Sequence, residues 1–101
     1  MSLQLIITPD ADHDIDQACD WYEERQAGIG RRFVLAVRLR YEDILRSPSL
    51  PPAFGRKAVR KIRVPHWPYF IYYRIINDAQ IRIVAVIHGA RDRKYLNYRL
   101  R

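Results

Sequence analysis

Cysteine, glycine and long apolar runs are scarce in this chain of 101 residues, and each shortage excludes a class of protein. Cys19 is the single cysteine, so an internal disulfide and a cysteine-based zinc cluster are both excluded. The sequence contains no glycine-rich phosphate loop, Ser-His-Asp set or dinucleotide fingerprint, and we expect no cofactor. No apolar run approaches the roughly 18 residues that a membrane-spanning helix needs.

The first residues, MSLQLIITPDA, lack the basic start, the long apolar stretch and the small-residue cleavage site of a signal peptide. We therefore expect a cytoplasmic protein that does not bind a membrane. A single cysteine agrees with a reducing compartment.

Acidic residues are scarce beyond residue 30. Residues 1–30 carry seven acids and one base, a net charge of −6, whereas residues 31–101 carry 17 bases and four acids, a net charge of +13. The total is +7. A field of this sign attracts a polyanion or an acidic protein segment, so nucleic acid, the ribosome and an acidic partner protein are all compatible with it.

The length suits one domain with a single core between two layers of secondary structure, and we expect residues 1–101 to form it. A short strand is expected over residues 3–7. Thr8 then provides an N-cap and Pro9 suits the first position of a helix that ends before Gly28. Its apolar residues recur at helical spacing: Ile15, Ala18, Cys19 and Tyr22.

A second amphipathic helix is expected after the break at residues 28–30, and it should end at Ser47-Pro48. Two helices with so short a link pack as an antiparallel hairpin. Strands are expected over residues 58–64, 69–76 and 80–87, with a turn at Asn77-Asp78. The tail after His88 could add further helix.

The predicted fold is therefore α+β in the order β-α-α-β-β-β, a helical hairpin packed on a small, mostly antiparallel sheet. One layer of helices covers one face of the sheet, so we expect part of the other face to be exposed and available to a partner. Alternate positions of the strand at residues 58–64 place Lys61 and Arg63 on the face opposite Ile62 and Val64.

The aspartates between residues 10 and 16 alternate with other residues and include a nearby histidine, which raises the question of a metal site. Acidic side chains are also favourable at a helix N-terminus, where they interact with the helix dipole. We therefore interpret them as helix-start acids followed by a solvated face, and predict no metal.

The order of elements and two sequence stretches resemble the RelE/ParE superfamily, the toxins of bacterial type II toxin–antitoxin modules. The stretches are VRKIRVPHWPYFIYYRI at residues 59–75 and VIHGARD at residues 86–92. The resemblance covers essentially the whole chain and implies the RelE/ParE-like fold with a single toxin domain. The HGARD cluster is more typical of the ParE branch, the plasmid stabilisation proteins.

The RelE branch consists of ribosome-dependent, metal-independent endoribonucleases, and this chemistry is one alternative. The resemblance implies a basic second strand, an arginine after the last strand and a tyrosine beyond it. The positions that fit are Lys61, Arg63, Arg91 and either Tyr95 or Tyr98, with His88 or Tyr95 as the proton carrier. The arginine of the third strand is replaced by Phe70, which cannot hold a scissile phosphate. Enzymatic activity is thus left open.

The ParE branch inhibits DNA gyrase and requires a binding surface without proton transfer. On this interpretation, the basic and aromatic segment after the last strand contacts the target through Arg91, Arg93, Lys94, Tyr95 and Tyr98. Lys61 and Arg63 then contact an acidic antitoxin, the second expected partner. This is our leading hypothesis; the alternatives are the ribosome and mRNA as targets, or a family member that has lost its toxicity.

Overall fold

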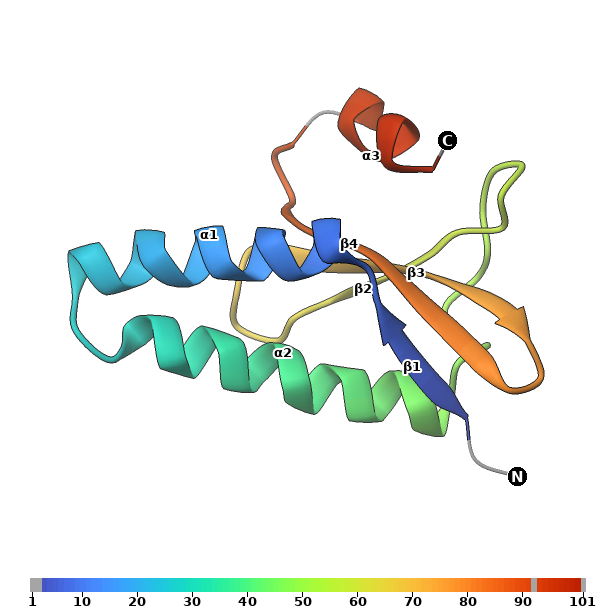
Figure 1. Cartoon of the computed structure of the whole chain (residues 1–101), viewed down its shortest axis with the longest axis horizontal. Helices are drawn as coiled ribbons and strands as arrows, with labels where there is room; N and C mark the ends of the chain where they lie inside the picture. The colour runs from blue at the N-terminus through green and yellow to red at the C-terminus, as the bar shows by residue number, and fades with distance from the viewer. Residues whose placement is uncertain (1–2, 92, 101) are drawn as a thin grey trace.

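The computed structural model describes residues 3–91 and 93–100, which form two long helices, a four-stranded sheet and a short third helix (Figure 1). The elements are β1 (Gln4–Ile7), α1 (Pro9–Arg25), α2 (Ile29–Arg46), β2 (Arg60–Arg63), β3 (Tyr69–Asn77), β4 (Gln80–His88) and α3 (Arg93–Arg99). This confirms the predicted α+β fold and the order β-α-α-β-β-β.

The strand order in the sheet is β1-β4-β3-β2. β1 runs parallel to β4, and the other neighbours are antiparallel. β1 ends in register with Ile83, because Ile7 pairs with that residue, whereas β4 continues to His88. The final part of β4 therefore extends beyond its parallel neighbour.

Local signals fix the ends of the helical hairpin. The Thr8 hydroxyl accepts a hydrogen bond from the Ala11 amide at 3.2 Å, and Pro9 occupies the first turn of α1. Gly28 precedes α2 with a φ of +91° and has no side chain to cap it. The Glu23 carboxylate of α1 takes this role, since its Oε1 accepts from the Arg31 amide in the first turn of α2 at 3.3 Å and its Oε2 accepts from the Gly28 amide at 3.0 Å.

The inner core lies between the helical hairpin and one face of the sheet (Figure 1). Its fully buried members include Phe33 and Val37 of α2 together with Ile71, Tyr73 and Ile83 of the sheet. Burial of such side chains stabilises the fold by about 1.5–3 kcal/mol each. The two layers are thus joined by apolar packing.

The outer face of the sheet is partly covered by α3, which packs on β4 (Figure 1). A bulge opposite Tyr72 and Tyr73 places Val84 and Ala85 consecutively in a second apolar cluster with Leu96 of α3. β4 contributes side chains to both apolar clusters, one on each face of the sheet, which explains why its residues are apolar on both faces. None of the helices in the described residues is long and apolar enough to cross a membrane.

Candidate functional site

Asp14 connects three elements at the end of the sheet. Its Oδ1 accepts from Arg99 Nη2 at 2.6 Å, and its Oδ2 accepts from Arg99 Nη1 at 2.9 Å and from the Val86 amide of β4 at 3.0 Å. The two side chains are 5% and 7% exposed. Asp14 was expected on a solvated face, and this expectation is wrong because the carboxylate serves as the anchor of α3.

Arg99 makes further contacts that hold α3 on β4. Its guanidinium donates to the Tyr95 hydroxyl and, through Nη1, to the Val84 carbonyl at 3.4 Å. Hydrogen bonding to Asp14 raises the pKa of Arg99 above its usual value. Arg99 therefore stays ionised, and Tyr95 is held as part of the support of α3.

Arg91 lies in the exposed turn after β4, and its guanidinium carbon lies 4.5 Å from the centre of the Tyr95 ring. Its amide donates to the His88 carbonyl at 2.9 Å, which fixes the turn. Gly89 lies between them, and a Cβ at that position would come within 2.9 Å of the Phe70 ring. The close approach of Gly89 to β3 thus sets the position from which Arg91 projects.

His88 ends β4 on the same face as the inner core. Its ring meets Tyr69 edge to face at 5.4 Å between centroids, and its Nδ1 accepts from the Ala90 amide at 3.0 Å. The acceptor role of Nδ1 places the proton on Nε2 in the neutral ring. His88 is therefore oriented by its own turn and by an aromatic neighbour.

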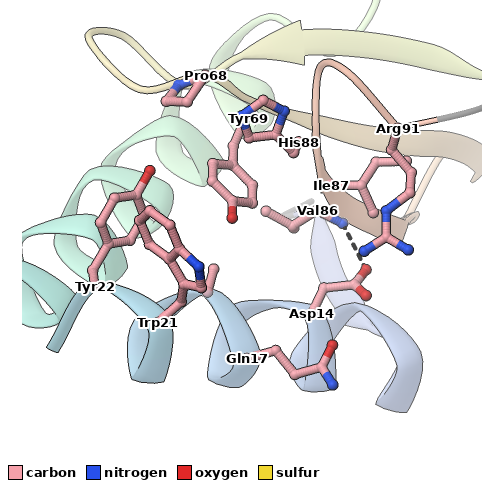
Figure 2. A pocket seen from close by; sticks show the side chains of 11 residues that line it. Asp14, Gln17, Trp21, Tyr22, Pro68, Tyr69, Val86, Ile87, His88 and Arg91 are labelled. Atoms are coloured by element: carbon pink, nitrogen blue, oxygen red, sulfur yellow. Dashed lines mark hydrogen bonds between the residues drawn. The ribbon is translucent and has the colours of Figure 1, made fainter. Parts of the chain in front are cut away.

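A groove of about 510 Å³ lies between α1 and the end of β4 (Figure 2). Figure 2 shows Trp21 and Tyr22 projecting from α1 on one side, with Tyr69, His88 and Arg91 facing them across the opening. Burial raises the pKa of Tyr69, and the charge of Arg91 partly offsets this effect. We call this space the edge groove; its lining residues include Asp14, Trp21, Tyr22, Tyr69, His88 and Arg91.

Lys61 and Arg63 lie elsewhere, on the outer face of β2. Both are exposed, while Ile62 between them packs against the inner core. The Lys61 ammonium lies 5.0 Å from the centre of the Phe70 ring, and Arg63 Nε donates to the Trp67 carbonyl at 3.1 Å. This basic surface has an aromatic ring where a third cation would be needed to clamp a phosphate.

The exposed side of α3 carries Lys94 and Tyr98, and the Tyr98 side chain is 68% exposed. These residues are four apart, so they lie on one helical face, whereas Tyr95 and Arg99 lie on the face toward β4. Arg93 begins α3, and its side chain is outside the described part of the chain. Arg91, Lys94 and Tyr98 thus belong to one exposed segment.

The residues considered for RNA cleavage are divided between the two faces of the sheet. His88 points to the inner side, beside Tyr69 and the edge groove, while Lys61 and Arg63 point to the outer side. Tyr95 packs in the outer cluster, and its hydroxyl is engaged by Arg99. The arrangement provides two separated surfaces suited to binding, a basic outer face and an aromatic edge groove.

The model of a protein family, described as the ParE toxin of the type II toxin–antitoxin system parDE, matches residues 5–93. The chain belongs to the ParE toxin family. Membership implies a protein antitoxin as a partner. The matched range runs from the second residue of β1 through the turn that carries Arg91, so the residues of the edge groove lie within the family's domain.

A solved structure, described as the "Chromosomal ParDE TA system from P. aeruginosa", contains a chain with the same fold. The match has a TM-score of 0.63 at 19% sequence identity, and covers 86% of this chain and 96% of that one. At this identity the match establishes the shared ParE fold. A comparison with curated proteins found no match to this sequence.

Sequence reasoning missed Asp14, Arg99 and Trp21 as parts of this region. A signal for Asp14 was present, since it lies three residues after Ala11 and four before Ala18, both buried on the face toward the sheet. No local pattern indicates Arg99, because its partner is 85 residues away in the sequence. Trp21 is 49% exposed, and its place in the groove is visible only from the tertiary structure, in which α1 lies beside β4.

Proposed function

We propose that this ParE family member is a toxin that inhibits DNA gyrase by binding it and is neutralised by an acidic antitoxin. The target-binding surface is the segment after β4, with Arg91, Arg93, Lys94 and Tyr98 as contacts and Tyr95 beneath Arg91. An exposed segment mounted on a buried strand is a suitable recognition element, because the scaffold holds it in place.

The observation that carries this proposal is the separation of His88 from Lys61 and Arg63 on opposite faces of the sheet. Cleavage of RNA through its own 2′-hydroxyl requires a base and a cationic clamp around one phosphate. A binding protein has no such requirement. The separation, together with Phe70 beside Lys61, therefore supports inhibition by binding over catalysis.

Tyr95 has a different role from the one that a catalytic residue would need. It lies between two guanidinium groups, with Arg91 at 4.5 Å and Arg99 at 4.6 Å from the ring centre. These contacts support a role in positioning Arg91 against α3. We propose that Tyr95 contributes to target binding through Arg91.

Lys61 and Arg63 are proposed as contacts for the antitoxin. Both are exposed on the outer face of β2, and the chain beyond residue 30 has a net charge of +13. An acidic antitoxin segment that orders on this face would gain charge-assisted hydrogen bonds and cover apolar sheet surface. Such a segment is the second partner of the module.

A supercoiling assay tests this proposal directly. Purified chain is added to DNA gyrase, ATP and relaxed plasmid, and the supercoiled product is measured on a gel. The proposal predicts loss of supercoiling with the native chain, much weaker inhibition with Arg91→Ala, and full inhibition with Arg38→Ala, a substitution of an exposed residue on α2. Undiminished supercoiling by a chain that still arrests growth would favour mRNA on the ribosome as the target, and a chain that does not arrest growth would be a non-toxic member.

A further inference from the structure

Two arginines lie directly opposite each other on neighbouring strands of the outer sheet face. Arg74 of β3 pairs in register with Arg82 of β4, and both alternate with residues of the inner core, so both side chains point outward. Arg82 is exposed, and no ion pair in the described part of the chain includes either residue. Like charges at directly opposed positions destabilise a sheet, so the fold alone does not account for this pair.

A short loop places a further cation beside the two arginines. Arg74 Nε donates to the Lys57 carbonyl at 2.8 Å. The loop is closed by two main-chain hydrogen bonds between Phe54 and Val59, at 2.8 and 2.9 Å, and within it Ala58 has a φ of +52°. Lys57 itself is exposed. The loop therefore holds the Lys57 main chain against Arg74 and leaves a third positive charge at this end of the outer face.

More cations follow on the same face toward the other end of β2. Lys61 and Arg63 occupy the next two outward rows of the sheet, opposite Tyr72 and Phe70. Successive rows lie about 6.6 Å apart along a strand, which is comparable with the separation of neighbouring phosphates in a nucleic-acid strand. We call these five cations the basic track: Lys57, Lys61, Arg63, Arg74 and Arg82.

Negative charge is nearly absent from the segment that forms the basic track. Residues 51–88 include seven bases and one acid, a net charge of +6. The acid is Asp78 in the turn between β3 and β4, and it forms no ion pair among the described residues. A row of cations without internal partners attracts an anion whose charge repeats along its length.

The surroundings of the track favour duplex DNA among such anions. A protein partner is normally held by apolar or aromatic anchors, and a single nucleic-acid strand by base stacking on exposed rings. On the track, Lys61 covers the Phe70 ring at 5.0 Å and Tyr72 packs in the second apolar cluster. The large apolar side chains that are exposed in the described residues all lie outside β2, β3 and β4: Ile7, Trp21, Leu35, Leu39, Leu50 and Tyr98. Duplex DNA needs only phosphate contacts.

We propose that the basic track binds the phosphate backbone of duplex DNA without reading its sequence. Arg74 and Arg82 donate to neighbouring phosphates, and Lys61 and Arg63 contact phosphates further along the duplex. A bound phosphate backbone compensates the two opposed arginines, which are left without a partner in the free chain.

This inference rests on the proposed function only in naming the source of the DNA, which is the segment held by gyrase. The segment after β4 then contacts the enzyme while the basic track contacts its DNA, so two surfaces hold the cleaved complex together. Lys61 and Arg63 are shared with the proposed antitoxin surface, and the antitoxin therefore competes with DNA there. Binding of free DNA and inhibition of gyrase are separate measurements, so either idea can fail alone.

Fluorescence anisotropy of a labelled duplex of mixed sequence measures binding by the full chain over a range of salt concentrations. For about four phosphate contacts, the logarithm of the association constant should fall against the logarithm of salt with a slope of about −3.6. Arg74→Gln/Arg82→Gln should reduce this slope to about −1.8 and weaken binding at least tenfold at low salt. The matched control is Arg32→Gln/Arg38→Gln, which removes the same charge from exposed positions of α2 and should bind nearly as the native chain does.

Melting curves provide a second measurement. Arg82→Gln alone should raise the melting temperature, because it removes the like charge opposite Arg74, while its affinity for the duplex falls. A lower melting temperature would mean that the fold itself uses the opposed pair, and would overturn the proposal. Excess duplex should raise the melting temperature of the native chain and leave that of Arg74→Gln/Arg82→Gln unchanged.

Three further results would overturn the proposal. The first is equal affinity of the two double variants for the duplex, which would reduce the effect to net charge. The second is equal or tighter binding of polyglutamate, and the third is tighter binding of single-stranded oligodeoxythymidine. Binding of the duplex as predicted by a chain that leaves gyrase active would support the track and refute the proposed function, whereas a gyrase inhibitor that does not bind the duplex would refute the track alone.

Discussion

The carboxylate of Asp14 and the guanidinium of Arg99 form a two-point ion pair between α1 and α3, although the residues are 85 positions apart in the sequence. Both side chains are almost completely buried. The Val86 amide donates a further hydrogen bond to the carboxylate, so the pair also holds the end of β4. The position of α3, and with it the segment after β4, depends on this contact.

Replacement of Asp14 by alanine should lower the free energy of unfolding by about 3 kcal/mol, because it leaves the Arg99 charge and the Val86 amide without their partner. Asp16→Ala is the matched control, since Asp16 is an exposed acid on the same helix, and it should change stability by less than about 0.5 kcal/mol. Urea denaturation measures both. If the two variants lose the same stability, the pair does not anchor α3.

Tyr41 and Tyr73 should respond oppositely to removal of their hydroxyl groups. Among the described residues the buried Tyr41 hydroxyl has no hydrogen-bond partner, whereas the Tyr73 hydroxyl donates to the Pro48 carbonyl at 2.8 Å. Tyr41→Phe should leave stability unchanged or raise it by up to about 1 kcal/mol, and Tyr73→Phe should lower it by about 1 kcal/mol. Chemical denaturation distinguishes them; a clear loss in Tyr41→Phe would reveal a bond to that hydroxyl.

Alkaline pH should destabilise the native chain more than Tyr41→Phe. Burial, with a smaller contribution from Asp12 and Asp14, raises the pKa of Tyr41 above its ordinary value of 10.0. The folded protein thus retains this proton when the unfolded chain loses it, and the stability contribution is present below pH 10 and lost above it. The difference between the two proteins should change by about 1.4 kcal/mol per pH unit above 10. A constant difference from pH 9 to about pH 11 would contradict the burial of a neutral phenol.

Gly30 lies where α2 approaches α1 most closely. A Cβ at this position would come within 2.5 Å of the Cys19 carbonyl oxygen and 2.8 Å of its sulfur. Gly30→Ala should therefore lower the free energy of unfolding by about 1–3 kcal/mol, despite the better helix propensity of alanine. Thermal melting measures the loss, and a rise in melting temperature would mean that the helices separate easily. A comparison of Arg38→Ala with Arg38→Gly, at an exposed position of the same helix, measures the effect of propensity alone.

The regular elements were predictable because their signals are local. Thr8-Pro9 specified the start of α1, Gly28 separated the helices, and Asn77-Asp78 specified the hairpin, whereas Gly30, expected in the break, lies inside α2. The parallel pairing of β1 with β4 was not specified in this way, because it joins residues about 76 positions apart, such as Gln4 and Gln80. The bulge at Val84 could not be predicted from the sequence either, because it depends on how β4 packs on both faces of the sheet.

The site was predictable only where residues are close in sequence. Arg91, Lys94 and Tyr98 lie in the exposed segment where the resemblance placed them, but their role in target binding stays a prediction. Asp14 was misjudged because an aspartate on an acidic helix normally faces solvent, and the arginine that overcomes its desolvation lies near the other end of the chain. The edge groove depends on where β1 ends relative to β4, which is a tertiary relationship.

Trapping of cleaved DNA tests whether the chain inhibits gyrase by binding through the segment after β4. Gyrase, ATP and supercoiled plasmid are incubated with the native chain, Arg91→Ala or Arg38→Ala, and covalently cleaved plasmid is measured after denaturation. We predict cleaved plasmid that requires both gyrase and the chain, persists with Arg38→Ala and falls at least tenfold with Arg91→Ala. Absence of cleaved plasmid at a large excess of a growth-arresting chain, or equal cleavage with both variants, would contradict this mechanism.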